Sequence, residues 1–343
     1  MNDFWKGKRV VITGGCSFIG SHLTEAVAGA GAIVLVVDDL SSGRREHIAL
    51  AMQQHGVVFI QGDLRDIRLC RTVLDGQDVV FHLAAVHGGR GFVHTFQASC
   101  SENFGIDSAV IQTAAKKSGK LVFASSGCVY PNMLQQNPDQ ELYLTEDMVG
   151  GRFVPYDCDG TYGYAKAMAE LTLRALRAES RFPSVSLRYF TVIGPRMKED
   201  HAIGAMIGRA FIRQDPFEIW GAGDQVRNWT YVDDIVRGTL LAAEKVEDAQ
   251  AINLGTMERT TVLQAAKIVC AHFDYLPRFN LLLHKPAGPL NRVADNTLAQ
   301  QLMNWDPEVP FVEGVRRTVA WYKFCQTIEE VSSRLTERAL LGR

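Results

Sequence analysis

The first half of the chain alternates short apolar runs with longer amphipathic segments, which is the pattern of parallel strands joined by helices. Several apolar runs are rich in valine and isoleucine without polar alternation, as expected of strands that are buried on both faces. The runs predicted as strands are residues 9–13, 33–38, 57–61, 79–83, 121–125 and 185–189. The segments predicted as helices are residues 19–30, 96–118 and 162–178. The pattern therefore predicts a doubly wound α/β sheet.

The second half is less regular, because prolines divide it into short segments after Gly194-Pro195. We expect a smaller α/β lobe there, built partly from loops. Residues 230–254 again read as a helix followed by a strand, so this stretch is expected to return to the first sheet. The predicted organisation is an N-terminal domain of residues 1–187, joined by residues 230–256, and an interleaved C-terminal α/β lobe of residues 188–343.

The composition narrows the class of protein. Of the 343 residues, 47% are hydrophobic and 22% are charged, and the net charge of −2 gives no general attraction to nucleic acid or to an anionic membrane. No apolar run approaches the ~18 residues of a membrane span, and the start lacks a signal-peptide pattern. The seven cysteines form no CxxC pair and no cluster with metal-ligand spacing. We therefore predict a reduced, cytoplasmic protein without a metal site.

A glycine turn follows the first predicted strand and opens a helix, at Thr13-Gly14-Gly15-Cys16-Ser17-Phe18-Ile19-Gly20. Such a turn brings backbone N–H groups and a helix N-terminus to a pyrophosphate, although Ser17 stands where a middle glycine is expected. The second strand ends at Asp38, a carboxylate placed to bind the ribose diol, which favours NAD over NADP. The sequence therefore predicts a Rossmann domain that binds NAD. The expected cofactor contacts are Gly14, Ser17, Phe18, Ile19, Gly20, Asp38, Asp63, Leu64, Leu83, Ala84, Ala85, Tyr162 and Lys166.

Tyr162 and Lys166 lie one helical turn apart on the same face of a predicted helix. A lysine ammonium beside a phenol stabilises the phenolate and lowers the pKa of the tyrosine from its usual value of ~10. The phenolate can then accept a proton from an alcohol while NAD accepts the hydride. Ser126, which follows the fifth predicted strand, is expected to hydrogen-bond the same hydroxyl.

With these residues, the chain resembles the extended short-chain dehydrogenase/reductase family, and its nucleotide-sugar enzymes in particular. The resemblance spans residues 8–325, and the segments that carry it are residues 13–20, Asp38, Gly62-Asp63, residues 82–85, Ser125-Ser126, Val129-Tyr130, Tyr162, Lys166, residues 188–190, Gly194-Pro195, residues 221–227 and residues 232–234. It implies that Arg227 and Arg292 contact the diphosphate of a nucleotide sugar, a role that suits a planar guanidinium. It also implies a homodimer formed through the two long helices.

The positions just after the catalytic serine separate the reactions of this family. Dehydratases and decarboxylases typically carry acidic residues there, whereas this chain has Gly127 and Cys128. Cysteine at this place resembles the GDP-mannose 3,5-epimerases, as do residues 85–92 and residues 217–221. The resemblance implies that Cys128 is the base that inverts C3 and/or C5 of a transient 4-keto sugar.

Inversion also needs an acid on the opposite face of the sugar ring. By a gapped match, the acid of the resembled enzymes falls on His201, whose imidazolium can donate a proton near neutrality. The glycine-rich loop of residues 85–92 implies substrate contacts from His87, Gly88 and Arg90, in addition to Ser126.

Other functions remain open at this point. A nucleotide-sugar 4-epimerase, similar to UDP-glucose 4-epimerase, would need Ser126, Tyr162, Lys166 and NAD, and could dispense with Cys128. A 4,6-dehydratase is disfavoured by the missing carboxylates. A non-catalytic protein that senses NAD is opposed by the intact Tyr162 and Lys166.

Overall fold

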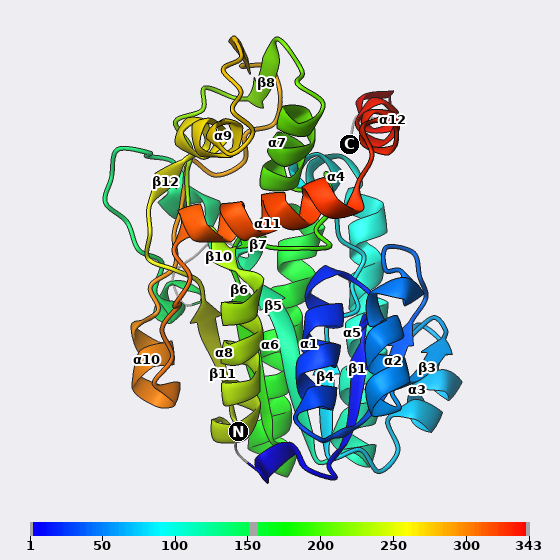
Figure 1. Cartoon of the computed structure of the whole chain (residues 1–343). Helices are drawn as coiled ribbons and strands as arrows, with labels where there is room; N and C mark the ends of the chain where they lie inside the picture. The colour runs from blue at the N-terminus through cyan, green and yellow to red at the C-terminus, as the bar shows by residue number, and fades with distance from the viewer. Residues whose placement is uncertain (1–2, 151–156, 341–343) are drawn as a thin grey trace.

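The computed structural model describes residues 3–150 and 157–340. Its centre is a seven-stranded parallel sheet with the strand order β11-β6-β5-β4-β1-β2-β3 (Figure 1). The strands are β1 (Arg9–Thr13), β2 (Ile33–Asp38), β3 (Val58–Gln61), β4 (Val79–His82), β5 (Lys120–Ser126), β6 (Ser184–Tyr189) and β11 (Asp248–Leu254). The predicted Rossmann-type parallel sheet is confirmed.

Helices cover both faces of the sheet, because side chains alternate along each strand and both faces are apolar. Along β1, Val10 and Ile12 belong to one hydrophobic cluster and Val11 to another, on the opposite face. The helices of the first face are α1 (Phe18–Gly29), α2 (Ala49–His55) and α8 (Val232–Lys245), and those of the second are α3 (Ile67–Val73), α5 (Gln97–Lys117) and α6 (Gly160–Ser180).

The predicted elements of the first half match the observed ones within two residues at each end. One segment differs from its prediction. Residues 90–92 belong to the expected glycine-rich loop of residues 85–92, but they form the first turn of a short helix, α4 (Arg90–Thr95), directly before α5. The strand at the end of the stretch of residues 230–254 is β11, which pairs in parallel with β6 at the edge of the sheet.

Most of the remaining elements form a second layer beyond the carboxyl ends of the strands (Figure 1). They are β7 (Val192–Ile193), α7 (Ala202–Phe211), β8 (Phe217–Trp220), β9 (Val226–Arg227), β10 (Thr230–Tyr231), β12 (Thr260–Thr261), α9 (Val262–Ala271), β13 (Phe279–Leu282), β14 (Asn291–Arg292) and α12 (Ile328–Leu340). Helix α11 (Phe311–Cys325) crosses between the two parts, and α10 (Thr297–Met303) packs beside α8 and β11 at the edge of the sheet. Short strands pair as β12-β9-β14, β13-β8 and β10-β7.

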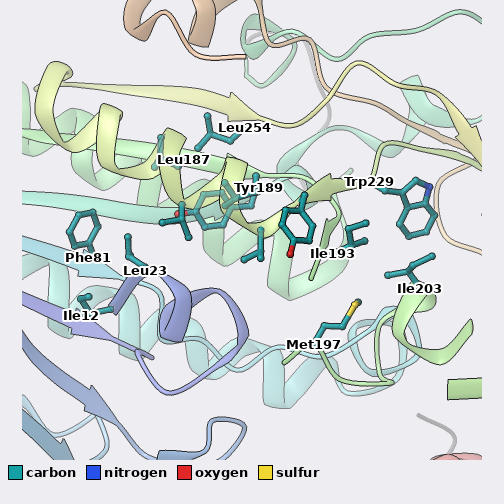
Figure 2. Close-up of a cluster of buried hydrophobic side chains, with 14 of the residues drawn as sticks. Ile12, Leu23, Phe81, Leu187, Tyr189, Ile193, Met197, Ile203, Trp229 and Leu254 are labelled. Atoms are coloured by element: carbon teal, nitrogen blue, oxygen red, sulfur yellow. The ribbon is translucent and has the colours of Figure 1, made fainter. Parts of the chain in front are cut away.

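A single hydrophobic core joins the sheet to this second layer. Figure 2 shows Ile12, Leu23 and Phe81 from the sheet and α1, with Ile203 and Trp229 further along the same cluster. The shared core fixes the second layer over the strand ends, where ligands bind in open α/β sheets. A cleft of about 980 Å³ lies at this junction. In the ranges 3–150 and 157–340, no helix combines the length and the apolar character that crossing a bilayer requires.

Candidate active site

The turn after β1 is shaped by glycines that leave no room for side chains. Gly14 has a φ of +71°, and a Cβ there would lie 2.8 Å from the backbone nitrogen of Ala84. A Cβ on Gly20 would lie 2.1 Å from the carbonyl oxygen of Gly14, so Gly20 lets α1 begin against the turn. Ser17 has a φ of −85°, which any residue adopts, and its hydroxyl donates to the Gly14 carbonyl at 2.6 Å. The turn therefore keeps its tight form with serine in place of the expected middle glycine.

Asp38 is buried beside this turn. Its carboxylate accepts hydrogen bonds from the backbone N–H groups of Cys16 and Leu40, each at 2.9 Å. Burial raises the pKa of Asp38, an effect that these hydrogen bonds oppose. A cavity of about 70 Å³ adjoins it, lined by the cofactor residues Gly14, Ser17, Asp38, Asp63, Leu64, Leu83, Ala84 and Ala85. A tight turn at a helix N-terminus and a carboxylate at the end of the second strand are the features that bind the pyrophosphate and the ribose of a dinucleotide.

The main cleft contains the rest of the predicted site. Its lining includes the predicted residues Ser17, Phe18, Ile19, Leu83, Ala85, His87, Gly88, Arg90, Ser126, Cys128, Tyr162, Lys166, His201, Arg227 and Arg292. The structure thus brings every predicted site residue to one of the two cavities, with the exception of Gly20, which packs against Gly14.

Tyr162 and Lys166 are buried on α6, and the Lys166 ammonium lies 6.0 Å from the centre of the Tyr162 ring. Lys166 Nζ is also 3.7 Å from a carboxylate oxygen of Asp107 on α5. The same oxygen lies 3.1 Å from His82 Nε2, and His82 Nδ1 lies 2.8 Å from the hydroxyl of Thr13. Burial raises the pKa of Tyr162 and lowers that of Lys166. Asp107 and His82 were not predicted, since neither stands in a motif that pairs it with Lys166.

Ser126 and Cys128 lie beside Tyr162, where β5 ends. The Ser126 hydroxyl accepts a hydrogen bond from the Cys128 backbone N–H at 3.1 Å. Cys128 packs against a small cluster that contains Tyr162. A Cβ on Gly163 would lie 2.3 Å from the Cys128 carbonyl oxygen, so glycine at this place allows α6 to approach. The thiol and the phenol therefore face the cleft from adjacent positions.

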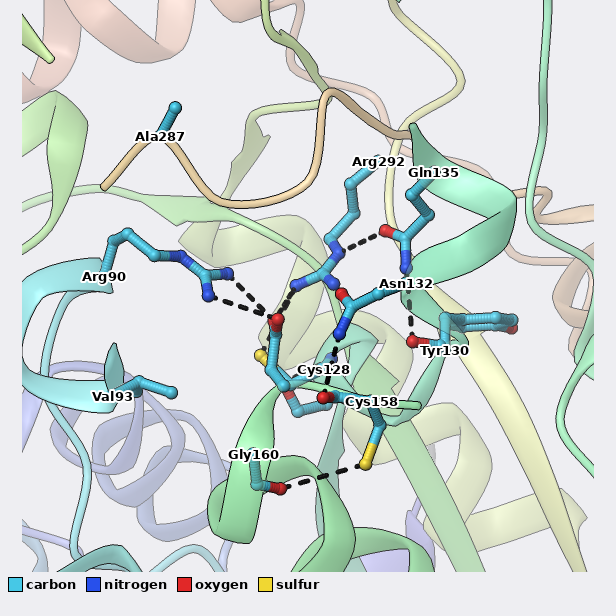
Figure 3. A network of polar contacts seen from close by, with 12 residues as sticks. Arg90, Val93, Cys128, Tyr130, Asn132, Gln135, Cys158, Gly160, Ala287 and Arg292 are labelled. Carbon is cyan, nitrogen blue, oxygen red and sulfur yellow. Dashed lines mark hydrogen bonds and ion pairs between the residues drawn. The ribbon is translucent and has the colours of Figure 1, made fainter. Parts of the chain in front are cut away.

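Two of the predicted arginines meet at a carboxylate that was not predicted. Asp159, the residue before α6, accepts two hydrogen bonds from Arg90, at 2.8 and 3.1 Å, and one from Arg292 Nη1 at 2.6 Å. Arg292 Nη1 also donates to Cys128 Sγ at 3.5 Å. Figure 3 shows the guanidinium groups of Arg90 and Arg292 pointing toward each other beside Cys128. Sequence reasoning missed Asp159 because its partners lie 69 and 133 residues away.

Positive charge exceeds negative charge in this cluster. Arg227 donates to the carbonyl oxygens of Val226 and Ala287, and no carboxylate partner is recorded for it among the described residues. Burial, together with the charges of Arg292 and Arg90, lowers the pKa of Arg227 to about 9. Arg292 Nη2 is buried without a hydrogen-bond partner in the described part of the chain. The three guanidinium groups are therefore suited to bind an anionic ligand.

Two histidines, His87 and His201, also line the cleft. The His87 ring lies 4.7 Å from the Tyr162 ring and 5.4 Å from the His201 ring, between centroids. Burial lowers the pKa of His87 to about 3, so this imidazole is neutral. His201 stands directly before α7, and its Nε2 lies 3.8 Å from the Asp200 carboxylate. His201 and Cys128 thus line the same cleft, with His87 and Tyr162 as neighbours.

Comparisons with known proteins agree with this geometry. Residues 10–255 match the NAD dependent epimerase/dehydratase family. GDP-mannose 3,5-epimerase 1 of Oryza sativa subsp. japonica is 28% identical over 332 residues, which cover 94% of this chain and 84% of that protein. UDP-N-acetyl-alpha-D-glucosaminuronate decarboxylase of Bacillus cytotoxicus is 27% identical over 327 residues, 92% of this chain and 98% of that protein.

Among solved structures, UDP-glucuronic acid 4-epimerase from Bacillus cereus, in complex with UDP-glucuronic acid and NAD, superposes with a TM-score of 0.81. It is 26% identical, and the match covers 92% of this chain and 99% of that one. A glycine turn after the first strand and a carboxylate at the end of the second are the features with which Rossmann folds bind NAD. The chain belongs to the NAD dependent epimerase/dehydratase family, and its cofactor is NAD.

Proposed function

We propose that the protein is a nucleotide-sugar epimerase that inverts C3 and/or C5 through a transient 4-keto sugar. The observation that carries the proposal is the place of Cys128, whose sulfur faces Arg292 at 3.5 Å inside the cleft that holds Ser126 and Tyr162. A thiol at this place can reach the ring that is oxidised beside Tyr162. A guanidinium next to the sulfur stabilises the thiolate, the form that removes a proton.

The first stage would oxidise C4 of the sugar. Tyr162 accepts the proton of the C4 hydroxyl, Lys166 stabilises the phenolate, and Ser126 hydrogen-bonds the reacting oxygen. Bound NAD would supply the hydride acceptor for this oxidation and the hydride donor for the final reduction, so that it would be unchanged over a complete turnover.

The second stage would invert a neighbouring carbon. A ketone at C4 acidifies the C–H bonds at C3 and C5, because the negative charge left on carbon is shared with the ketone oxygen. The Cys128 thiolate takes this proton on one face of the ring, and His201 donates a proton to the other face. Cys128 and His201 line the same cleft as Tyr162, the residue that would oxidise C4.

The substrate would be held by its diphosphate. Arg227 and Arg292 supply the cationic donors that phosphate oxygens require, and they lie beside Cys128 rather than beside the adenosine cavity. The curated relatives include enzymes named for GDP-mannose and for a UDP-linked uronic acid, which supports a nucleotide-diphosphate sugar as substrate and leaves the base and the sugar open.

Turnover in D₂O tests the proposal. The enzyme is incubated with a panel of GDP- and UDP-sugars, and the products are examined by NMR for deuterium at C3 and C5. We expect deuterium at the inverted carbon, and its loss in Cys128→Ala, while the matched variant Cys158→Ala keeps it. Cys158 lies close by, but its thiol donates to the Gly160 carbonyl at 3.8 Å, whereas the Arg292 hydrogen bond goes to Cys128. Inversion at C3 or C5 without deuterium uptake would exclude this mechanism.

A 4-epimerase is the second candidate, and one observation favours it. Burial and the charge of Asp159 raise the pKa of Cys128, which favours the neutral thiol over the thiolate. A 4-epimerase would need only Ser126, Tyr162 and Lys166 besides NAD. It would invert C4 without incorporating deuterium, and Cys128→Ala would retain full turnover.

A further inference from the structure

One nitrogen of Arg292 serves two acceptors of different charge. Nη1 donates to Asp159 Oδ2 at 2.6 Å and to Cys128 Sγ at 3.5 Å. The carboxylate holds the closer place, and it also receives both terminal nitrogens of Arg90. The sulfur therefore shares its only guanidinium contact in the described structure with a competing anion.

The backbone fixes this arrangement. The backbone N–H of Asp159 donates to the carbonyl of Cys128 at 3.1 Å, and the N–H of Gly163 donates to the carbonyl of Asp159 at 3.1 Å. Asp159 is thus tied both to the thiol-bearing residue and to the first turn of the helix that carries Tyr162. Its side chain is 4% exposed, so solvent screens its charge only weakly.

We propose that Asp159 is a positioning residue that sets the balance between thiol and thiolate at Cys128, with Arg90 as the counter-charge that limits its effect. The proposal rests on the proposed role of Cys128 as a base. It assigns Arg90 a function that differs from the predicted contact with substrate, since both terminal nitrogens of Arg90 are taken by Asp159.

The charges around Cys128 determine in which direction each of them shifts the pKa of the thiol. Burial raises the pKa of the thiol, Asp159 raises it further, and Arg292 and Arg90 oppose them. Arg227 also faces the thiol, as a further cation. Burial alone would raise the pKa of Asp159, but Arg292 and Arg90 hold it well below its ordinary range, so it remains an anion.

The other groups around the thiol add no charge of their own near neutral pH. Ser126 donates a hydrogen bond that favours the thiolate, while Tyr162, Cys100 and Cys158 are titratable neighbours whose pKa values are raised by burial. Removing the charge of Asp159 and removing that of Arg90 should therefore shift the balance between thiol and thiolate at Cys128 in opposite directions.

Two substitutions with opposite expected effects test the proposal. Asp159→Asn removes the negative charge and keeps an oxygen that can hold Arg292. The thiolate fraction should rise, and alkylation of Cys128 at about pH 7.5 should become about five- to tenfold faster. Arg90→Met removes the opposing cation at similar volume, and alkylation should become about threefold slower.

The measurement uses the NAD-loaded enzyme without substrate, so it does not depend on turnover. Iodoacetamide is added over a range of about pH 6 to pH 9, and peptide mapping by mass spectrometry follows Cys128, with the exposed Cys325 as internal reference. Asp157→Asn is the matched control, because Asp157 bonds the backbone of Met133 rather than an arginine.

Opposite shifts of the Cys128 pH profile in the two variants, with no shift in Asp157→Asn, support the proposal. Faster alkylation in both Asp159→Asn and Arg90→Met would mean that each merely loosens the packing, and would overturn it. An unchanged profile in Asp159→Asn would overturn it as well. None of these outcomes decides whether Cys128 is the catalytic base, which the deuterium experiment tests separately.

Discussion

Two buried groups of charges lie close to Tyr162, and they differ in balance. In one group, the Lys166 ammonium lies 3.7 Å from Asp107, whose carboxylate also meets the neutral ring of His82. In the other group, Arg90 and Arg292 bond the carboxylate of Asp159, and Arg227 is a third cation that interacts with it electrostatically. The first group pairs one cation with one anion, whereas the second keeps an excess of positive charge.

This difference in net charge separates a pair that is neutral by itself from a cluster that an anionic ligand would neutralise. A buried pair can remain stable when its geometry and hydrogen bonds compensate for lost hydration, but uncompensated buried charges are costly. Lys166 and Asp107 carry opposite charges that compensate each other, although Lys166 Nζ and the second Asp107 oxygen have no hydrogen-bond partner among the described residues. In the arginine group the positive charges exceed the negative one, and burial together with the charges of Arg292 and Arg90 lowers the pKa of Arg227, as expected of a site that an anion completes.

The largest expected effect concerns Tyr162, the neighbour of the Lys166–Asp107 pair. Tyr162→Phe removes the hydroxyl that accepts the substrate proton, so turnover should fall roughly 10³-fold. Product formation, followed by chromatography of sugar nucleotides, measures the loss. Tyr164→Phe, on the same helix and packed near Phe104, should retain near-normal turnover. Similar activity in Tyr162→Phe and the native protein would remove Tyr162 from the proposed chemistry.

Tyr162, Lys166 and the cofactor site were largely predictable because their signals are local. The glycine turn occupies eight consecutive residues, and Tyr162 and Lys166 are one turn apart in one helix. Such spacings survive folding unchanged, since the backbone of a strand or helix fixes them. The observed strands accordingly follow the predicted apolar runs, as β1 and β2 show with no shift at either end.

The partners of these residues were not predictable for a physical reason. Asp107 lies inside α5, where a carboxylate ordinarily faces water, and only the packing of α5 on the sheet brings it to Lys166. Asp159 receives Arg90 from α4 and Arg292 from β14. No spacing in one sequence encodes a contact between elements that meet only after the core has formed.

The second effect concerns the arginine group. Arg227→Met should raise the KM for the sugar nucleotide about 30- to 100-fold and change kcat less, because a charge-assisted contact worth about 2–3 kcal/mol is lost. Steady-state kinetics check this, with Arg316→Met as control, since Arg316 is exposed and pairs with Glu313. An unchanged KM in Arg227→Met would contradict a role in diphosphate binding.

Arg227→Met also tests whether the excess of positive charge destabilises the enzyme when no substrate is bound. Removing a cation that is repelled by Arg90 and Arg292 should raise the unfolding stability of the free enzyme by about 1 kcal/mol. Thermal unfolding in the absence of nucleotide sugar measures this change. A lower Tm in Arg227→Met would indicate that the guanidinium stabilises the free protein, and would weaken the contrast between the two groups.

The smallest expected effect concerns Asp107. Its negative charge raises the pKa of Tyr162 and also raises that of Lys166, in each case against a background set mainly by burial. Asp107→Asn should therefore lower both pKa values. The active form has the phenol deprotonated and the lysine protonated, so activity rises with pH through the first titration and falls through the second.

Because both titrations move in the same direction, the whole pH–rate profile of Asp107→Asn should shift to lower pH, by about one unit or less. The pH dependence of kcat/KM measures the shift. Asp75→Asn is the matched control, because Asp75 also pairs with a lysine, Lys117, but at an exposed site where solvent screens the charge. A profile that narrows without moving would mean that Asp107 shifts the pKa of only one of the two groups. A shift to higher pH would show that Asp107 acts through the position of His82 rather than through its charge.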